Sequence, residues 1–225
     1  RAAREIKNLN RVYALLSNTN KAIVRKNQQK ELFDEVCSIA IKDGKFNIAW
    51  IGILNKKTQL IEVVTAAQSG KSINGEEEVI VANLNQCQCL SEIVLKTKNS
   101  FITNDFQNEQ KVLECKNGEI LTDTKSAASF PIKLFGNIVG TLNLFVNQAD
   151  FFHKGEIKLL EDLTQDISFA IEYIETEKIR SEIEMMLKKK EALLSFAGKM
   201  AKFGAWSVDL KTNTIMWSDE VADIH

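Results

Sequence analysis

The sequence predicts an α+β fold with α/β/α layers, in which a central, mainly antiparallel sheet is flanked by helices and long helices lie at both ends. Two observations predict it. In Ser126–Phe152, apolar and polar residues alternate on either side of Gly136-Asn137, which is the pattern of a β-hairpin with one face in a core. From Lys154 onward, apolar residues instead recur every three or four positions, which predicts a long helix leaving that sheet.

The totals argue against two classes of protein. A chain of 225 residues can bury a full domain core, and its formal net charge of −1 lacks the basic excess of a nucleic-acid-binding protein. No apolar run is as long as a membrane span and no signal peptide precedes the first helix, so we predict no membrane contact for this segment. The chain starts and stops inside predicted elements, and we expect it to be part of a longer protein.

Four cysteines, Cys37, Cys87, Cys89 and Cys115, are irregularly spaced. Without secretory marks this pattern favours free thiols in a reducing compartment, so we expect a cytoplasmic location. Cys37 falls in an apolar helical stripe and is expected to be buried. Cys87 and Cys89 form a CxC, which has too few ligands for structural zinc, so no metal site is predicted.

Residues 1–26 are predicted to form a signalling and dimerisation helix. Two interpretations of its apolar seam stay open: it pairs with a second copy of the chain, which we favour, or it packs on its own domain. The spacing of three, four, three and seven residues is typical of a narrow coiled-coil seam made by Ile6, Leu9, Tyr13, Leu16 and Ile23. A solvated face is expected for the basic residues Arg1, Arg4, Lys7 and Arg11.

A second helix and a second hairpin are predicted to follow. A wide apolar stripe begins at Leu32, and Gly44 is well placed to end that helix. Phe46–Leu54 is apolar on both faces, as in a central strand, and Leu60–Ala67 is its β-branched partner. The loop Gln68–Gly75 lacks the glycine spacing of a phosphate-binding loop, so no P-loop is predicted.

Between the two hairpins, Cys89–Lys98 is predicted to be a helix and Ser100–Thr103 a short strand. Asn104-Asp105 then occupies the N-cap position of a helix expected at Phe106–Cys115. For Asp105 we weigh this cap role above ligand contact. Pro131, in the first strand of the later hairpin, indicates an edge or an irregular position.

The last helix has a predicted buried stripe from Ile157 to Ile174 and continues beyond it. Between Ile174 and Ile179 the apolar seam slips by five residues, a phase change that alters supercoiling and would fall where the globular domain ends. Gly198 is expected to close this helix. Gly204–Ser218 then predicts the first hairpin of another domain.

This order of elements resembles the GAF family, and in detail the bacterial GAF sensory domains of histidine kinases and cyclic-di-nucleotide enzymes. The residues that carry the resemblance are Arg11–Ala40, Phe46–Leu54, Ser100–Phe106, Ser126–Phe145 and Phe151–Ile174. A further stretch, Phe203–His225, is similar to the opening of a PAS domain and ends before the core of such a domain is complete.

The resemblances imply four segments in a cytoplasmic, multi-domain signalling protein. Residues 1–26 would be the N-terminal signalling helix and residues 27–175 the GAF domain. Residues 176–197 would be a helical coiled-coil linker, and residues 198–225 the truncated beginning of a PAS domain.

The first implied function is a non-catalytic sensory module. It would bind a small ligand, or relay a conformational change through a parallel helical homodimer, to the PAS domain and an output domain that we expect to be a histidine kinase. A ligand-free structural spacer is a variant of this function. The ligand candidates, placed by the family's pocket position, are Thr65, Asn104, Asp105, Phe130 and Asn143. The dimer and signalling positions are Leu9, Tyr13, Leu16, Ile23, Ile171, Ile174, Ile179, Ile183 and Met186.

The alternative is a cysteine-dependent redox enzyme similar to the free methionine sulfoxide reductases, which share the GAF fold. Cys87 or Cys89, with Cys115, could stand for their cysteines, although the flanking residues match poorly and long helices have no use there. The haem, bilin and cyclic-nucleotide signatures of other GAF domains are not recognisable. The two histidines, His153 and His225, lie outside the pocket-forming region, and the sequence leaves the identity of a cofactor unknown.

Overall fold

The computed structural model describes residues 2–70, 89–110, 112, 123–201 and 206–217. The chain divides into two compact units, Arg1–Ile174 and Glu175–His225. The long last helix, α5 (Lys154–Ala201), begins in the first unit and ends in the second. Each unit is described by itself below.

The first unit is built on a five-stranded sheet with the order β2-β1-β5-β4-β3, in which every described pair of neighbours is antiparallel. The strands are β1 (Ile48–Leu54), β2 (Ile61–Gln68), β3 (Phe101–Thr103), β4 (Ser126–Leu134) and β5 (Asn137–Val146). Both predicted hairpins are present, and Phe135-Gly136 makes the turn of the second, with positive φ at both residues. The α+β fold class is therefore confirmed.

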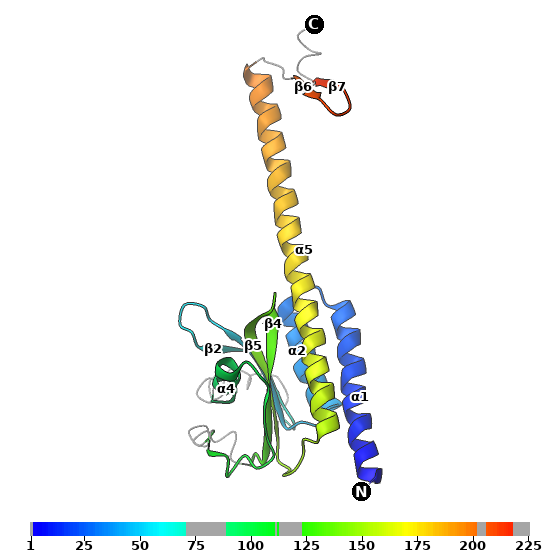
Figure 1. Cartoon of the computed structure of the whole chain (residues 1–225), viewed down its shortest axis with the longest axis vertical. Helices are drawn as coiled ribbons and strands as arrows, with labels where there is room; N and C mark the ends of the chain where they lie inside the picture. Colours follow the sequence, from blue (N-terminus) through cyan, green and yellow to red (C-terminus); the bar gives the residue numbers. More distant parts are fainter. Residues whose placement is uncertain (1, 71–88, 111, 113–122, 202–205, 218–225) are drawn as a thin grey trace. The chain divides into compact units, whose positions relative to one another are not determined.

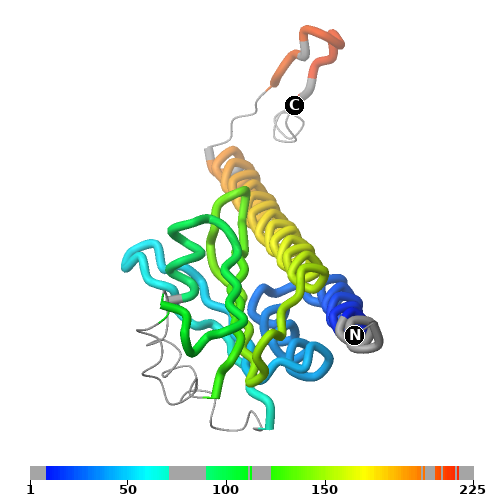
Figure 2. Tube along the Cα trace, turned by 60° about the horizontal axis from the view of Figure 1, so that its bottom comes forward, coloured from blue at the N-terminus to red at the C-terminus, as the bar shows by residue number. Residues whose placement is uncertain are grey.

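One face of the sheet is covered by α1 (Ala2–Arg25), α2 (Gln29–Lys42) and the first part of α5, as Figures 1 and 2 show. We call it the helix-covered face. Its core is apolar and closely packed: the helices contribute Leu15, Phe33, Val36, Leu160 and Ile167, and the strands Ile51, Phe130, Ile132, Leu142 and Leu144. Each such side chain contributes about 1.5–3 kcal/mol to stability by leaving water.

The opposite face is covered by α4 (Cys89–Thr97), which packs on β4 and β5. We call it the α4-facing side. Its smaller apolar core joins Leu90 of α4 to Trp50, Ile61 and Phe145 of the sheet, with Phe106 edge-on to Phe145 at 6.1 Å between ring centroids. The sheet therefore has two separately packed faces.

The start of α5 agrees with the sequence prediction. The backbone carbonyl of His153 accepts the first helical hydrogen bond from the Ile157 amide, so His153 is the N-cap. The Glu156 carboxylate accepts a hydrogen bond from the His153 amide at 3.2 Å, which is one half of a capping box. The predicted buried stripe is present, with Leu160, Leu163 and Ile167 almost fully buried.

The helix predicted at Phe106–Cys115 does not begin as predicted: residues 106–108 form turns, and residues 110 and 112 are in 3₁₀ conformation. The backbone carbonyl of Asp105 accepts hydrogen bonds from the amides of Asn108 and Glu109, while the Phe106 amide donates to Lys125. Burial of the Phe106 ring against Phe145 thus overrides the capping signal. The prediction that Gly198 closes α5 is also wrong: the helix continues to Ala201, since one internal glycine costs only about 1 kcal/mol.

Helix α1 packs on its own domain through a stripe next to the predicted seam. The buried residues of this stripe are Val12, Leu15, Thr19 and Ala22. Of the predicted seam, Leu16 and Ile23 only flank the core, and Tyr13 is 55% exposed. The solvated position predicted for Arg11 is wrong, because only 11% of its side chain is exposed and it is ion-paired with Glu156 of α5.

The edge position predicted for Pro131 is confirmed. Strand β3 pairs with β4 only from Ala127 to Ser129, so β4 is an open edge from Phe130 onward. Side chains of α5 take the free amides there. The Lys133 amide donates to Ser168 Oγ at 3.0 Å, and the Phe135 amide donates to the Glu172 carboxylate at 2.6 Å. These contacts satisfy an edge that would otherwise invite another strand.

The second unit holds the rest of α5 and a two-stranded sheet of β6 (Trp206–Asp209) and β7 (Thr214–Trp217), which is the predicted hairpin. Along α5, side chains are exposed from Thr176 to Ala197. Within the described residues, no helix is both long and apolar enough to cross a membrane.

Candidate functional site

The candidate site is a row of side chains that crosses the sheet on its α4-facing side. Strand register places Ala66, Trp50, Asn143, Ser129 and Phe101 directly opposite one another on β2, β1, β5, β4 and β3. We call these five residues the cross-strand row. Directly opposed residues point to the same face, with Cβ atoms about 4.5–5.5 Å apart. The row is therefore an aromatic–amide–hydroxyl–aromatic surface without a charged side chain.

Helix α4 contributes a hydroxyl to the middle of this surface. Ser91 Oγ lies 2.8 Å from Thr141 Oγ1 and 3.2 Å from Asn143 Oδ1, and Asn143 Nδ2 lies 2.9 Å from Thr141 Oγ1. All three residues are fully buried. If Ser91 donates to Asn143, Asn143 to Thr141 and Thr141 to Ser91, the three groups form a closed ring. Such a ring satisfies its members and strengthens each bond.

Two polar atoms of the row have no hydrogen-bond partner within the described part of the chain. Trp50 Nε1 and Ser129 Oγ are buried without a hydrogen bond, on either side of Asn143. A buried polar group left unpaired costs about 1–3 kcal/mol, so such groups are few in folded proteins and call for an explanation. Trp50 can only donate, whereas Ser129 can donate or accept. Together they suit a ligand that carries a hydrogen-bond acceptor.

The sequence-predicted ligand residues divide between the two faces. Asn143 belongs to the cross-strand row. Phe130 is one residue from Ser129, points to the opposite face and is fully buried in the helix-covered core. Thr65 is opposite Ile51, whose side chain also belongs to that core, so it too is turned away from the row.

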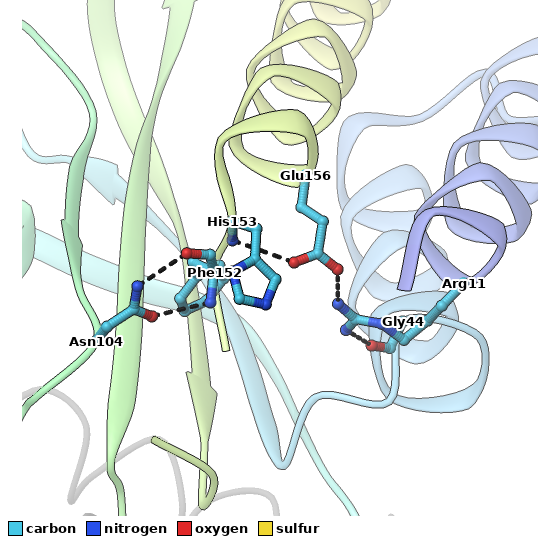
Figure 3. Close-up of polar contacts among 6 residues, drawn as sticks. All are labelled: Arg11, Gly44, Asn104, Phe152, His153 and Glu156. Atoms are coloured by element: carbon cyan, nitrogen blue, oxygen red, sulfur yellow. Dashed lines mark hydrogen bonds and ion pairs between the residues drawn. The ribbon is translucent and has the colours of Figure 1, made fainter. Parts of the chain in front are cut away.

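Asn104 and Asp105 lie just beyond β3, and the Asn104 side chain is committed to the chain itself (Figure 3). Its amide group donates to the Phe152 carbonyl and its carbonyl accepts from the Phe152 amide, both at 2.8 Å. Asp105 is exposed, and its carboxylate accepts from the Asn108 side chain at 2.9 Å. Ligand contact by any of the five predicted residues stays a prediction.

The predicted signalling positions also separate into two groups. Ile171 is buried and Ile174 is partly buried against the helix-covered core, so both serve their own domain. Ile179, Ile183 and Met186 are 42%, 62% and 60% exposed. On α5, the positions from Ile179 onward are therefore the ones open to a partner, and on α1 Tyr13 is exposed as well.

The cysteines give little support for redox chemistry in the described part of the chain. Cys37 is fully buried against the helix-covered face, and burial raises the pKa of its thiol. Cys89 is the first residue of α4, while Cys87 and Cys115 lie outside the described residues. Among the residues described, no three histidine, cysteine, aspartate or glutamate side chains are grouped as a metal site.

A surface pocket of about 620 Å³ lies at the end of α4, apart from the residues of the row. Its apolar lining includes Leu54, Ile61 and Leu95, and Lys98 and Lys133 supply positive charge. None of the predicted ligand residues lines it.

Of the row and the Ser91–Thr141–Asn143 cluster, the sequence predicted Asn143 alone, and the residues it missed include Trp50, Ser91 and Ser129. A signal existed for each. Ser91 shares its helical face with the predicted inward residue Val94, and in the predicted alternation Ser129 lies on the face opposite Phe130. Trp50 is the bulkiest side chain of a strand predicted to be buried on both faces.

The fold and the row together define an α+β domain with a stabilising helical face and a polar interior face under a short helix. The model of the GAF domain family matches residues 27–172, so the chain belongs to the GAF family. Among curated proteins, none matches the sequence.

Solved structures with this fold come from several bacterial proteins. A GAF domain from a phosphoenolpyruvate-protein phosphotransferase (ptsP) of Coxiella burnetii is 12% identical, with a TM-score of 0.61, covering 76% of this chain and 98% of that one. A free methionine-R-sulfoxide reductase of Neisseria meningitidis, solved with its substrate, is 8% identical, with a TM-score of 0.59, covering 74% and 91%. A domain of a putative two-component sensor histidine kinase of Sinorhizobium meliloti 1021 is 13% identical, with a TM-score of 0.52, covering 69% and 99%. At such identities the likeness concerns the fold alone.

Proposed function

We propose that this chain is a non-catalytic sensory GAF module of a multi-domain signalling protein. It binds a small molecule against the cross-strand row and relays the resulting change through a parallel helical homodimer. The receiving parts are a PAS domain that begins near residue 198 and an output domain of the histidine kinase class. The protein works in the cytoplasm.

The observation that carries this proposal is the pair of unpartnered polar atoms, Trp50 Nε1 and Ser129 Oγ, on a buried surface. Nearby, the Ser91–Thr141–Asn143 cluster is satisfied by its own hydrogen bonds, so this face does tolerate polar groups when they are paired. A ligand acceptor that paired with Trp50 and Ser129 would offset the cost of burying them. It would thereby favour the conformation in which the row is assembled.

The proposed homodimer forms through α5. Its residues Ile179, Ile183, Met186 and Leu193 follow each other at four, three and seven positions, and all are exposed in the single chain. This is heptad spacing, with Lys190 at the remaining seam position. A second copy that buried this seam would remove large apolar side chains from water. A lysine within a seam favours one register over others.

A binding screen with a matched variant tests the sensory role. Purified full chain is mixed with nucleotides, haem, flavins and small metabolites, and the melting temperature is recorded. Compounds that raise it are then tested on Trp50→Phe, which removes the indole donor, and on Trp217→Phe, a control 62% exposed on β7. We expect the ligand effect to weaken in Trp50→Phe alone. If no compound stabilises the wild type, the chain is a ligand-free spacer.

The dimer is tested by measuring the mass of the full chain in solution across a range of concentrations. We expect a dimer that dissociates in Ile183→Glu, since a carboxylate would be buried in the seam. Ser181→Glu, on the same helix but off the seam, should leave the dimer intact. A strict monomer at high concentration would remove the homodimer from the proposal.

The redox alternative is decided by activity. If the chain were a free methionine sulfoxide reductase, it would consume NADPH in a coupled assay, and Cys115→Ser would abolish the signal. We expect no turnover above a blank. Sustained turnover that needs Cys115 would replace the sensory proposal with the enzymatic one.

A further inference from the structure

A closed set of contacts surrounds the first turn of α5 and begins at Asn104 (Figure 3). Besides its two side-chain bonds to Phe152, Asn104 accepts a hydrogen bond on its backbone carbonyl from the Asp150 amide at 3.3 Å, and Ser126 Oγ lies at the same distance from that carbonyl. One residue at the end of β3 thus fixes the whole connection between β5 and α5. Asn104 is also only three residues from Phe101, the end of the cross-strand row.

Three phenylalanine rings continue the set from Asn104 toward the helices. Phe151 lies edge-on to Phe152 at 5.3 Å and to Phe46 at 5.7 Å, and Phe46 stacks on Phe152 at 6.2 Å between centroids. Phe46 lies between α2, which ends at Lys42, and β1, while Phe151 and Phe152 lie just before His153, the N-cap of α5. Because all three rings are buried, a displacement of Phe152 moves the other two.

Arg11 of α1 closes the set. Its guanidinium carbon lies 4.1 Å from the Phe151 ring centroid and 5.4 Å from that of Phe46, which is cation–π geometry. One terminal nitrogen donates to the Gly44 carbonyl after α2, and the other donates to Glu156 Oε1 on α5. Glu156 Oε2 in turn accepts from the His153 amide, one residue beyond Phe152.

The ion pair at the centre of this set is out of water. The Glu156 side chain is 2% exposed and the Arg11 side chain 11%. Burial lowers the pKa of Arg11, while the hydrogen bond and the charge of Glu156 act in the opposite direction. A buried pair of this kind tolerates few geometries, because either partner left alone is an uncompensated charge. The position of the Arg11 side chain therefore depends on the position of Glu156 in the first turn of α5.

We propose that Asn104, the three phenylalanines and the Arg11–Glu156 pair act as a relay, through which the end of β3 sets the position of α1 and of the first turn of α5. The relay rests on the proposed function for its use, since it supplies the route from the row to the signalling helices. Asn104 and Arg11 make no direct contact with each other. If each residue only stabilised its own surroundings, a change at Asn104 would not affect Arg11, so coupling between them distinguishes the relay from two separate stabilising roles.

Hydrogen exchange on the full chain, without any ligand, tests the relay. Asn104→Ala removes both side-chain bonds to Phe152. We expect faster exchange at residues 150–157, which include the Asn104 partners Asp150 and Phe152, and also at residues 9–15 around Arg11, which do not bond Asn104. A coupling of the usual size predicts a rise of about 5- to 150-fold at residues 9–15. The amides of β1 and β5 should keep their protection.

The control is Asn108→Ala, in the same loop, where the side chain is exposed and bonds the Asp105 carboxylate. It should leave residues 9–15 unchanged. Coupling is reciprocal, so Glu156→Gln should in turn speed exchange at Asp150 and Phe152. If Asn104→Ala does not fold, Asn104→Asp is used instead, because it keeps the acceptor for the Phe152 amide.

Two results would overturn the relay. Faster exchange confined to residues 150–157 would make Asn104 a local clip, and an equal rise throughout β1 and β5 would make it a general stabilising residue. Neither result bears on whether a ligand binds the row, which the melting screen decides separately.

Discussion

The two faces of this sheet are made from the same strands and differ in what they bury. On the helix-covered face, Ile51, Phe130, Leu142 and Leu144 meet apolar stripes of three helices. On the α4-facing side, the neighbouring residues along the same strands include Trp50, Ser129 and Asn143. Alternation along a strand makes this division possible, since each residue points opposite to the next.

The difference separates stability from binding. An apolar face gains free energy from every side chain and needs no partner outside the chain. The α4-facing side buries two unpaired polar atoms in one row of the sheet, while α1 buries two more, Arg11 Nε and Thr19 Oγ1, and each such atom lowers stability. Natural proteins tolerate such costs mainly where function uses them. Substitutions at residues that are neighbours in sequence but lie on different faces should therefore change the free energy of unfolding by different amounts.

The largest effect is expected from Phe130→Ala. Phe130 is fully buried between β4 and the helices, so its truncation should lower the free energy of unfolding by about 3–5 kcal/mol, measured by urea denaturation. Phe135→Ala, in the turn of the same hairpin and 58% exposed, is the control and should cost far less. Equal losses would mean that the helix-covered face is not the stabilising one.

A smaller loss is expected from Asn143→Ala on the other face. The substitution opens the Ser91–Thr141–Asn143 ring and leaves Ser91 and Thr141 with fewer partners, at about 1–3 kcal/mol of unfolding free energy. Asn137→Ala, exposed at the start of the same strand, should be nearly neutral. In a double-mutant cycle, Ser91→Ala should cost less when Asn143 is already replaced, because the Ser91–Asn143 hydrogen bond is lost in either single variant. Additive effects would show that the ring does not act as a unit.

The ionisation of the Cys37 thiol tests how completely water is excluded from the helix-covered face. Burial, and next the charge of Asp34, raise the pKa of its thiol above the unfolded value of about 8.5. A raised folded pKa gives stability that is complete below pH 8.5 and is lost as pH rises beyond it. At pH 9.5 the unfolded thiol ionises while the folded one does not, which lowers the free energy of unfolding by about 1 kcal/mol. Cys37→Ala should therefore lose less stability between pH 7 and pH 9.5 than the wild type, in denaturation curves at the two pH values.

Periodicity predicted both hairpins and the inward stripe of α5, since each is decided by residues close in sequence. The buried side of α1 was not predictable in this way. Val12, Leu15 and Thr19 have the same helical spacing as Leu9, Tyr13 and Leu16, so the sequence offers two stripes. The choice depends on Arg11 meeting Glu156, 145 residues further along the chain. No local pattern contains that contact.

The candidate site was predicted only in part, for a geometric reason. In a strand, an error of one position moves a side chain to the other face. The family's pocket position indicated Phe130 and Thr65, whereas the residues on the α4-facing side are their neighbours Ser129 and Ala66. At Thr65 an irregularity of register between Ile51 and Gly52 adds to the difficulty, because it breaks simple alternation.

The smallest effect, and the sharpest test of the comparison, is expected from Ser129→Ala. Its hydroxyl has no partner, so its removal should leave the unfolding free energy unchanged or raise it by up to about 1 kcal/mol. Ser126→Ala is the matched control: it is equally buried on the same strand, but its hydroxyl donates to the Gln148 carbonyl at 2.7 Å. That substitution should cost about 1–3 kcal/mol. If Ser129→Ala is as destabilising as Ser126→Ala, the Ser129 hydroxyl has a partner within the protein, and the main reason for placing a ligand acceptor at the row is gone.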